Sequence, residues 1–295
     1  MAIGDRTMSF KLWTTDTPQF IKELLPTFHT SSGYNNMELV TVAERLGISQ
    51  SARLMRRLMQ FWYALGILDR EKETSGAYRY TISYFGDNVL DSIQFGATMT
   101  YDLIHWSMYS AWIRIPNFEW GWSWLYRETC DEVWESSPGE IAVKRLQAAL
   151  LERANHAFPE LSPTFDVNTI RAVASWLSAL EPPFLVKAHE SSKSARLLSR
   201  KRERCSPELL FLSLQLQYTL RGLPFGTPLL MDEELIAAVC RVCMLDSAQF
   251  WPMAELCGLM FPSLTRKETA YGTSLTVSEA APFTPPLPRG TGTTS

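Results

Sequence analysis

The sequence predicts a mainly α-helical protein with a winged helix-turn-helix near its N-terminus, followed by an all-α domain. Two observations lead to this fold class. Residues 39–82 contain a Leu-Gly-Ile turn between two helical patterns and end in a short hairpin pattern, and most of the later chain has apolar residues at helical spacing. We expect the winged unit to span residues 36–95 and the helical domain to span residues 96–272.

Bulk composition limits the classes of function. The chain has 295 residues, 46% of them hydrophobic, and a formal net charge of −3, so a general polyanion binder is excluded and DNA contact needs a local basic face. No apolar run approaches the roughly 18 residues of a membrane span, and the N-terminal residues lack the apolar core of a signal peptide. Five sparse cysteines are typical of reduced thiols. We therefore expect a cytoplasmic protein with no membrane contact.

The elements are expected in the following order along the chain. A lead-in, residues 1–35, holds one short helix from Pro18 to Leu25, which Pro26 should end. The winged unit follows, and its last helix should begin near Gly86. Helical patterns in the later domain cover residues 140–157, 167–180, 207–220 and 232–245, and the small, polar, proline-rich stretch 273–295 should remain a disordered tail.

The second helix of the winged unit is the candidate recognition helix, because two different stripes run along it. One stripe is apolar and should face the core, whereas the opposite side carries three arginines and a glutamine. Arginine can contact phosphates and guanine edges, and glutamine can read adenine. We expect Ser49 to cap this helix, with Gln50 and Ser51 in its first turn, where groove contacts usually begin. The candidate DNA-contacting residues are Ser49, Gln50, Ser51, Arg53, Arg56, Arg57 and Gln60.

The hairpin that follows should form the wing. Arg70, Lys72 and Arg79 are candidates for phosphate contacts, although acidic residues alternate with them, so affinity should be modest and sensitive to salt. Winged helices also serve as dimerisation or protein-docking modules, and an arginine face can be merely solvated. Both DNA contact and protein docking therefore remain open at this point.

A second basic segment, residues 189–205, is the other candidate for nucleic-acid contact. It contains serine as well as basic residues and has few acids. One interpretation is a flexible phosphate-binding loop, and the other is a solvated linker between helical layers. The candidate residues are Lys193, Arg196, Arg200, Lys201, Arg202 and Arg204.

Cysteine and aromatic residues offer two further interpretations. Cys240 and Cys243 form a CxxC pair that, with Cys205 and Cys257, has the donor set of a zinc site; because the pair lies in an apolar helical pattern, buried structural cysteines are favoured and no metal is expected. The tryptophan-rich segment 97–135 is favoured as core and subunit interface over a base-stacking platform. Within this segment we expect His105 to be a core histidine.

Several of these motifs resemble known families. The winged segment is similar to the N-terminal domain of small-molecule O-methyltransferases, but the glycine-rich cofactor loop of those enzymes is missing. The chain also resembles an uncharacterised bacterial family, a domain of unknown function found beside DNA phosphorothioation and related defence genes. The departure is at Ser49-Gln50-Ser51, where that family has Gly-Lys-Asn and a turn two residues shorter. The matching parts are Leu46-Gly47-Ile48, Leu54-Met55-Arg56-Arg57-Leu58, Gly66-Ile67-Leu68, Thr81 with Gly86, Leu103-Ile104-His105-Trp106, and Cys205-Ser206-Pro207-Glu208-Leu209-Leu210.

No sequence motif indicates catalysis or a cofactor. There is no phosphate-binding loop, no GxSxG, no HExxH and no paired acidic nuclease motif. The resemblance and the basic faces together predict a DNA-binding accessory subunit of a bacterial defence or DNA-modification complex, with duplex DNA and protein subunits as partners and with no enzymatic activity. Two alternatives stay open: a protein-interaction or homodimeric adaptor without DNA contact, and a winged-helix transcriptional regulator.

Overall fold

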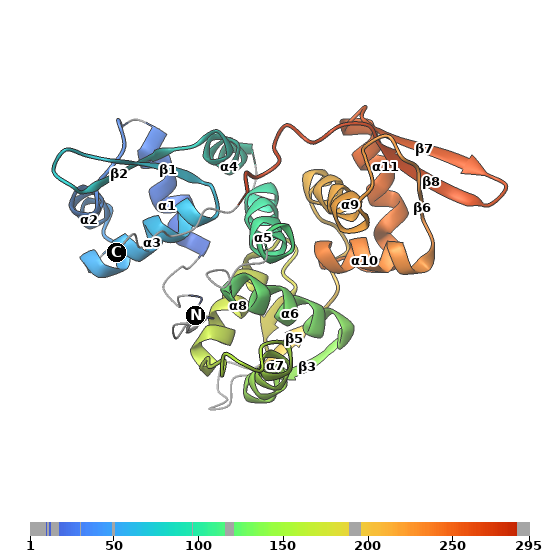
Figure 1. The fold of residues 1–295 in the computed structure, drawn as a ribbon, viewed down its shortest axis with the longest axis horizontal. Helices are drawn as coiled ribbons and strands as arrows, with labels where there is room; N and C mark the ends of the chain where they lie inside the picture. Colours follow the sequence, from blue (N-terminus) through green and yellow to red (C-terminus); the bar gives the residue numbers. More distant parts are fainter. Residues whose placement is uncertain are drawn as a thin grey trace, which may run out of the picture.

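The computed structural model confirms a mainly helical protein with small β-sheets. Three groups of elements lie side by side in Figure 1: an N-terminal unit with α1–α4, a central unit with α5–α8, and a C-terminal unit with α9–α11. Among the described helices, none is long and apolar enough to cross a membrane. The structure describes residues 10, 12, 18–29, 31–48, 51–95, 97–115, 121–188 and 196–287.

The N-terminal unit contains four helices and a two-stranded hairpin. Asn35 caps α2 in a reciprocal box with Glu38, and Tyr34 pairs with Tyr80 beside the hairpin. The prediction that Pro26 ends the first helix is wrong, because the helix continues to His29. The elements are α1 (Pro18–His29), α2 (Asn36–Arg45), α3 (Ala52–Ala64), β1 (Leu68–Lys72), β2 (Tyr78–Ile82) and α4 (Tyr84–Phe95).

Packing explains why the first helix passes through Pro26. Phe28, in its last turn, is almost fully buried, and its ring contacts those of Tyr34 and Trp62 with centroid separations of 4.9 and 6.2 Å. This aromatic cluster fixes the turn after the proline, so tertiary burial outweighs the local preference to stop.

The central unit contains four helices and a three-stranded antiparallel sheet in the order β3-β5-β4. The sheet shows that the expectation of an all-α domain is wrong. Residues 140–142, predicted as the start of a helix, instead pair with β5 in the register Glu140↔Leu198. The elements are α5 (Ala97–Arg114), α6 (Gly121–Glu135), β3 (Gly139–Ala142), α7 (Val143–Ala157), α8 (Val167–Ala179), β4 (Leu185–Lys187) and β5 (Arg196–Ser199).

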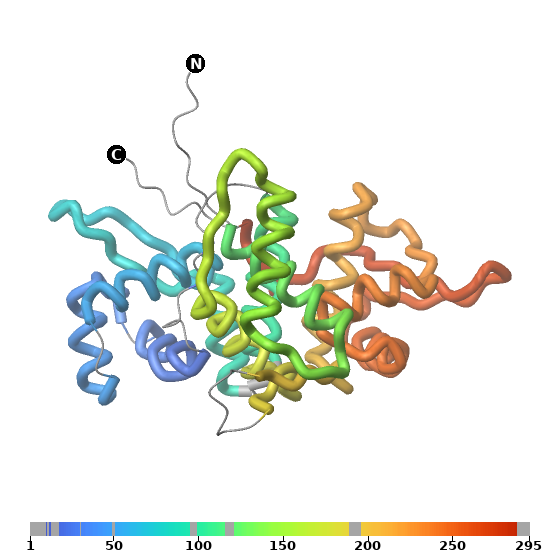
Figure 2. Tube along the Cα trace, turned by 90° about the horizontal axis from the view of Figure 1, so that it is seen from below, coloured from blue at the N-terminus to red at the C-terminus, as the bar shows by residue number. Residues whose placement is uncertain are grey.

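The C-terminal unit combines three helices with a second three-stranded sheet, ordered β6-β8-β7. Its hairpin projects from one end of the molecule (Figure 2). The prediction of a disordered tail from residue 273 is wrong over most of its length, because residues 272–277 form the central strand of this sheet; residues 288–295 lie outside the described residues. The elements are α9 (Pro207–Arg221), β6 (Leu229–Leu230), α10 (Glu233–Cys243), the 3-10 turn η2 (Ser247–Gln249), α11 (Phe250–Met260), β7 (Leu264–Thr269) and β8 (Gly272–Val277).

Residues 278–287 form a strap that returns from the C-terminal unit to the N-terminal unit, visible as the red segment across Figure 1. The Gln215 side chain accepts a hydrogen bond from the Ala281 backbone N–H at 3.0 Å. Further along, Arg114 donates to the Pro285 carbonyl at 2.7 Å. The proline-rich end of the strap then lies against the turn that follows α3.

A buried ion pair joins the central and C-terminal units. Arg202, between β5 and α9, lies 2.8 Å from Asp102 Oδ1 on α5, and both side chains are fully buried. Arg202 also donates to the carbonyls of Glu181 at 2.9 Å and Cys243 at 3.2 Å. The Ser206 backbone N–H donates to the other oxygen of Asp102 at 2.6 Å. Each of these contacts joins segments that are distant in sequence, so the pair fixes how they meet.

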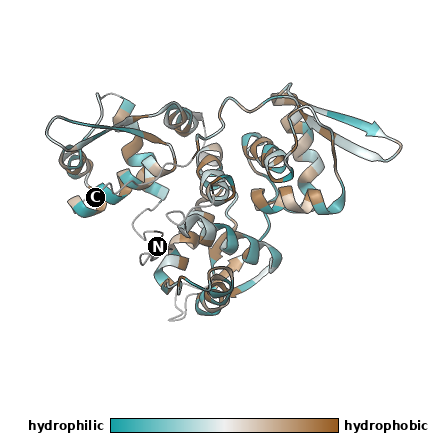
Figure 3. Ribbon diagram, in the orientation of Figure 1, coloured by the Kyte–Doolittle hydropathy of each residue, from teal (hydrophilic) through white to brown (hydrophobic). Residues whose placement is uncertain are grey.

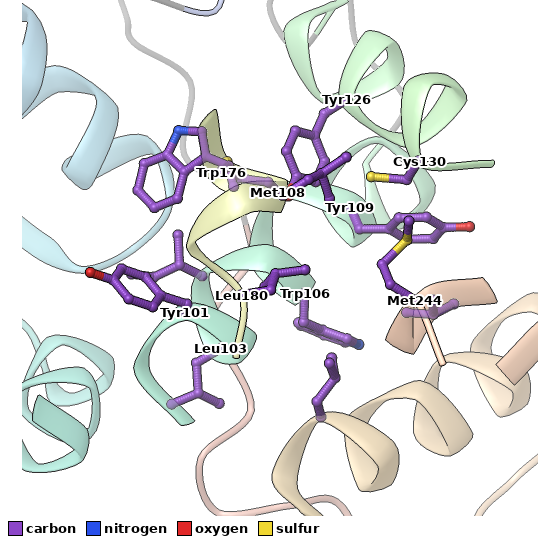
Figure 4. Close-up of a cluster of buried hydrophobic side chains, with 14 of the residues drawn as sticks. Tyr101, Leu103, Trp106, Met108, Tyr109, Tyr126, Cys130, Trp176, Leu180 and Met244 are labelled. Atoms are coloured by element: carbon purple, nitrogen blue, oxygen red, sulfur yellow. The ribbon is translucent and has the colours of Figure 1, made fainter. Parts of the chain in front are cut away.

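The expectation that His105 is a core histidine is confirmed. His105 is buried on α5, with Nε2 2.7 Å from the Val242 carbonyl and Nδ1 2.8 Å from the Tyr126 hydroxyl. A carbonyl only accepts, so Nε2 carries the proton and Nδ1 accepts from Tyr126. Burial lowers the pKa of His105 to about 4, so the ring is neutral at pH 7. Figure 4 shows a buried cluster of the core, to which α5 contributes Trp106 and Tyr109 and α6 contributes Tyr126.

Four tryptophans of the segment 97–135 also lie in the core, and Trp112 is partly buried against it. Trp106, Trp122, Trp124 and Trp134 are each at most 9% exposed, so their ring faces are not available as a stacking platform for single-stranded bases.

The first prediction concerns the buried ion pair. Replacing Asp102 with asparagine leaves the Arg202 charge uncompensated in a dry site, so the free energy of unfolding should fall by about 3–5 kcal/mol. Glu140→Gln is the matched control, because it breaks the exposed pair with Arg196, where the loss should stay below about 1 kcal/mol. Urea unfolding measures both, and equal losses in the two variants would contradict the assignment.

The second prediction is a pH dependence. The folded pKa of His105 is about 4 against 6.5 for the free side chain, so the unfolded chain takes up the proton first as the pH falls. Stability from this group is therefore complete above pH 6.5 and is lost towards pH 4, by on the order of 3 kcal/mol. Asp131, whose pKa burial raises to about 6, has the opposite effect but is present in both proteins when His105→Gln is compared with the parent chain. The slope between pH 6.5 and 4 should be smaller in His105→Gln; parallel curves would refute a neutral buried imidazole.

Candidate nucleic-acid interface

The candidate recognition helix is α3, which begins later than the sequence suggested. Ser51 is its N-cap, and the Ser51 side chain accepts a hydrogen bond from the Leu54 backbone N–H at 3.3 Å. The prediction that Ser51 lies inside the first turn, after a cap at Ser49, is therefore wrong. Ser49 and Gln50 lie outside the described residues, so their predicted DNA contacts stay predictions.

The two stripes of α3 lie as predicted. Met55, Leu58 and Trp62 are at most 1% exposed, so the apolar stripe faces the core. The opposite side holds the predicted polar residues: Arg53 and Arg56 are exposed, and Arg57 and Gln60 are partly exposed.

Arg70, predicted to contact phosphate, is held between two aromatic rings. Its guanidinium lies 4.2 Å from the ring centroid of Tyr63, near the end of α3, and 4.6 Å from that of Tyr78 on β2. Such stacking stabilises a cation and fixes its plane. In this structure Arg70 joins the hairpin to the end of α3.

Arg79, also predicted to contact phosphate, lies in an ionic network on the other side of the hairpin. Its guanidinium bonds to Glu73 at 2.6 Å, Glu38 at 3.2 Å and the Gly33 carbonyl at 2.8 Å. Hydrogen bonds to Glu38 and then Glu73 raise the pKa of Arg79. A backbone hydrogen bond at Asn35, followed by the contact with Arg79, lowers the pKa of Glu38. The network joins β2 to the first turn of α2.

The three cations of the hairpin that were predicted to contact phosphate differ in their surroundings. Arg70 and Arg79 make internal contacts that position the hairpin, whereas Lys72 is exposed at the end of β1. The sequence analysis missed Tyr63 and Glu38, the partners that hold the two arginines. The Tyr-Arg-Tyr alternation at residues 78–80 could have indicated an aromatic partner for Arg70. In a strand it places Tyr78 and Tyr80 on one face and Arg79 on the other.

One residue of the basic segment 189–205 has a different role from the one predicted. Arg202 was predicted to bind phosphate, yet it is the fully buried partner of Asp102. A charge removed from water in this way has no surface to offer a nucleic acid. Lys193 lies outside the described residues.

The other described cations of this segment lie on β5 or shortly after it. Arg196, on β5, pairs with Glu140 at 2.8 Å, and the Lys201 ammonium lies 3.8 Å from the Trp134 ring centroid. Arg200 and Arg204 are exposed. Because β5 is the central strand of its sheet, residues 196–199 do not form a flexible arm.

The candidate zinc ligands belong to the core. Cys205, Cys240, Cys243 and Cys257 are buried free thiols, and burial is the main reason that the pKa of Cys240 is raised to about 12. Across the described part of the chain, no group of three or more histidine, cysteine, aspartate or glutamate side chains is arranged to hold a metal ion. The expectation that these cysteines are buried is confirmed, and the expectation that they bind no metal stays a prediction.

Comparison with known proteins gives a likeness of fold only. The sequence matches no family profile, and no curated protein is significantly similar to it. Among solved structures, a crystal structure of SspB with bound magnesium ion is similar at a TM-score of 0.60 and 14% identity, over 90% of this chain and 81% of that one. A second SspB crystal structure is similar at a TM-score of 0.60 and 12% identity, over 90% of this chain and 82% of that one.

The third prediction separates positioning from exposed cations. Arg70→Met removes the contact with the rings of Tyr63 and Tyr78, so the hairpin should open more readily and its amides should exchange with solvent roughly fivefold faster, as for about 1 kcal/mol. Lys72→Met removes the same charge from the same strand without losing a ring contact, and should leave exchange unchanged. Hydrogen exchange over residues 68–82 measures both; equal protection in the two variants would rule out the Arg70 contact as a brace.

Proposed function

We propose that this chain is a DNA-binding accessory subunit of a bacterial defence or DNA-modification assembly, and that its N-terminal unit is a winged helix. The element order supports the second part: α1 is followed by the extended residue Tyr34, then α2, α3 and the hairpin, with Tyr34 paired antiparallel to Tyr80. Winged helices use such a helix, strand and hairpin arrangement to present one helix to the major groove.

The observation that carries the proposal is the exposed polar face of α3. Arg53 and Arg56 are exposed three residues apart on the helix, with Arg57 and Gln60 beside them, while the opposite stripe is anchored in the core. A rigid helix with cations on its free side can place guanidinium groups against phosphates and guanine edges together. In the proposal Lys72 adds a backbone contact from the hairpin.

Two likenesses support the setting of a larger assembly. The sequence motifs resemble a family found beside phosphorothioation and defence genes, and the fold is similar to that of SspB. In this proposal the chain binds DNA and protein subunits and performs no catalytic step of its own.

A second candidate function is a protein-docking adaptor whose winged unit does not bind DNA. The observation in its favour is that Arg70 and Arg79 are engaged inside the unit, and that the chain as a whole is acidic, with a net charge of −3. Both facts reduce the positive charge available for phosphates.

The fourth prediction tests DNA binding directly. The double variant Arg53→Ala, Arg56→Ala should weaken binding to a duplex oligonucleotide at least tenfold, because two charge-assisted contacts are lost. The salt dependence should also change: if both arginines contact phosphates, the slope of log K against log salt should lose about 1.8 in magnitude. Fluorescence anisotropy at several salt concentrations gives both quantities.

Arg145→Ala, Arg171→Ala is the matched control for this experiment. Both arginines are exposed on other helices, α7 and α8, so the variant has the same change of net charge without touching α3. Binding should stay within twofold of the parent chain. If both double variants weaken binding equally, or if the parent chain does not bind duplex DNA at low salt, the DNA proposal fails and the adaptor remains.

A further inference from the structure

Strand β7 has one open edge. The carbonyls of Thr273 and Val277, on β8, accept hydrogen bonds from Met231 and Gly226 on the β6 side. The backbone groups of Ser274 and Thr276, which alternate with them, therefore face β7. In the observed register these pair with Thr265 and Lys267. Alternation along a strand therefore directs the backbone N–H and C=O groups of Arg266 and Glu268 outward.

No partner among the described residues covers this edge. The sheet order β6-β8-β7 places β7 at its border, and no backbone hydrogen bond joins Arg266 or Glu268 to another described segment on that side. An uncovered row of donors and acceptors can pair with another strand.

Helix α11 has three exposed apolar residues, one of which lies next to β7. Leu256, Leu259 and Met260 follow helical spacing and are 43%, 84% and 49% exposed. Leu259 also borders a groove of about 420 Å³ between α11 and β7, whose lining includes Gly258, Leu264 and Arg266. Three large apolar side chains on one free face of a short helix are typical of a docking surface.

The patch next to the groove carries both signs of charge, so it is complementary to the same patch on a second copy of the chain. Arg266 pairs with Glu268 at 2.7 Å and with Glu255 at 3.0 Å, and its guanidinium lies 4.6 Å from the Trp251 ring centroid. These side chains therefore lie on the α11 face of the sheet. If two β7 strands pair antiparallel about Lys267, Arg266 of each copy faces Glu268 of the other, and both belong to the outward-facing set.

We propose that β7 pairs with β7 of a second copy of this chain, forming a continuous six-stranded sheet with two α11 helices on one face. The three observations fit one two-fold arrangement. The backbone groups of Arg266 pair with those of Glu268 across the axis, the two charges alternate along the seam, and Leu259 of each copy lies on the same face of the joined sheet. A two-fold interface uses the same patch on both copies, so it must be self-complementary in this way. The inference goes beyond the proposed function and does not depend on DNA binding.

The pairing has one unfavourable contact. Lys267 of each copy lies opposite the other Lys267, on the face of the sheet away from α11. Figure 3 shows the β7 strand coloured as hydrophilic, in agreement with the exposed burial pattern of residues 265–269. Because this face is open to water, the repulsion is screened, and it provides a test of the register.

The first experiment measures mass in solution. At about 50 µM, where a micromolar dimer is mostly formed, sedimentation velocity should give twice the 33.6 kDa chain mass. Glu268→Pro should raise the dissociation constant at least tenfold, because it removes an outward N–H without touching the bonds to β8. Glu268→Ala loses the same carboxylate but keeps the N–H, so the gap between the two variants reports the backbone pairing. Leu259→Glu should also give a monomer.

The second experiment tests the register. When Lys267→Glu is mixed with the parent chain, the mixed dimer should exceed the statistical half of all dimers, because opposite charges then face each other. A monomeric parent chain, or a dimer that persists equally in Glu268→Pro and Glu268→Ala, would overturn the proposal. A statistical mixture with Lys267→Glu would overturn this register.

Discussion

The ion pair between Arg202 and Asp102 is the constraint on which the arrangement of the larger part of the chain depends. Both charges are fully buried, and a buried charge tolerates only arrangements in which it is compensated. Arg202 contacts α5, the end of α10 and the segment after α8 at once, while Asp102 also holds the backbone at the start of α9. Apolar packing alone would allow these helices to slide, because hydrophobic contacts are non-directional. The pair therefore fixes how the helices of the central unit lie against those of the C-terminal unit.

The N-terminal unit uses arginine in a similar way, nearer the surface. Arg70 and Arg79 hold the two sides of one hairpin, the first through tyrosine rings and the second through carboxylates. Their contacts position the hairpin beside α3, whereas Arg53 and Arg56 on α3 are exposed. Preorganisation of this kind lowers the entropy cost of binding, because the contacting groups are already placed. The number of cations in a sequence segment is therefore a poor guide to the number that meet a partner.

The helices were largely predictable from the sequence, and the sheets largely were not. Periodicity within a few turns predicted α8, α9 and α10 to within about two residues, because the information is local. Strand β3 was predicted as helix because its partner, β5, lies more than fifty residues later, and β8 looked like a tail because its composition is small and polar. At the candidate site the face of α3 was predictable, whereas the roles of the arginines were not. Arg200, Arg202 and Arg204 are equivalent in sequence, and only the fold brings Asp102 to one of them.

The strap has a consequence for the order in which the molecule is completed. Gly66, in the turn after α3, has φ +77° and lies so close to Pro286 that an added Cβ would be 2.4 Å from that ring. The first helices have long left the ribosome when residue 286 is synthesised, and domains generally fold as they emerge. The N-terminal unit therefore forms before its contact with the strap is made. The contact between Gly66 and Pro286 therefore ties a segment that is synthesised late to the turn that ends α3, a turn whose own helices are synthesised more than 200 residues earlier.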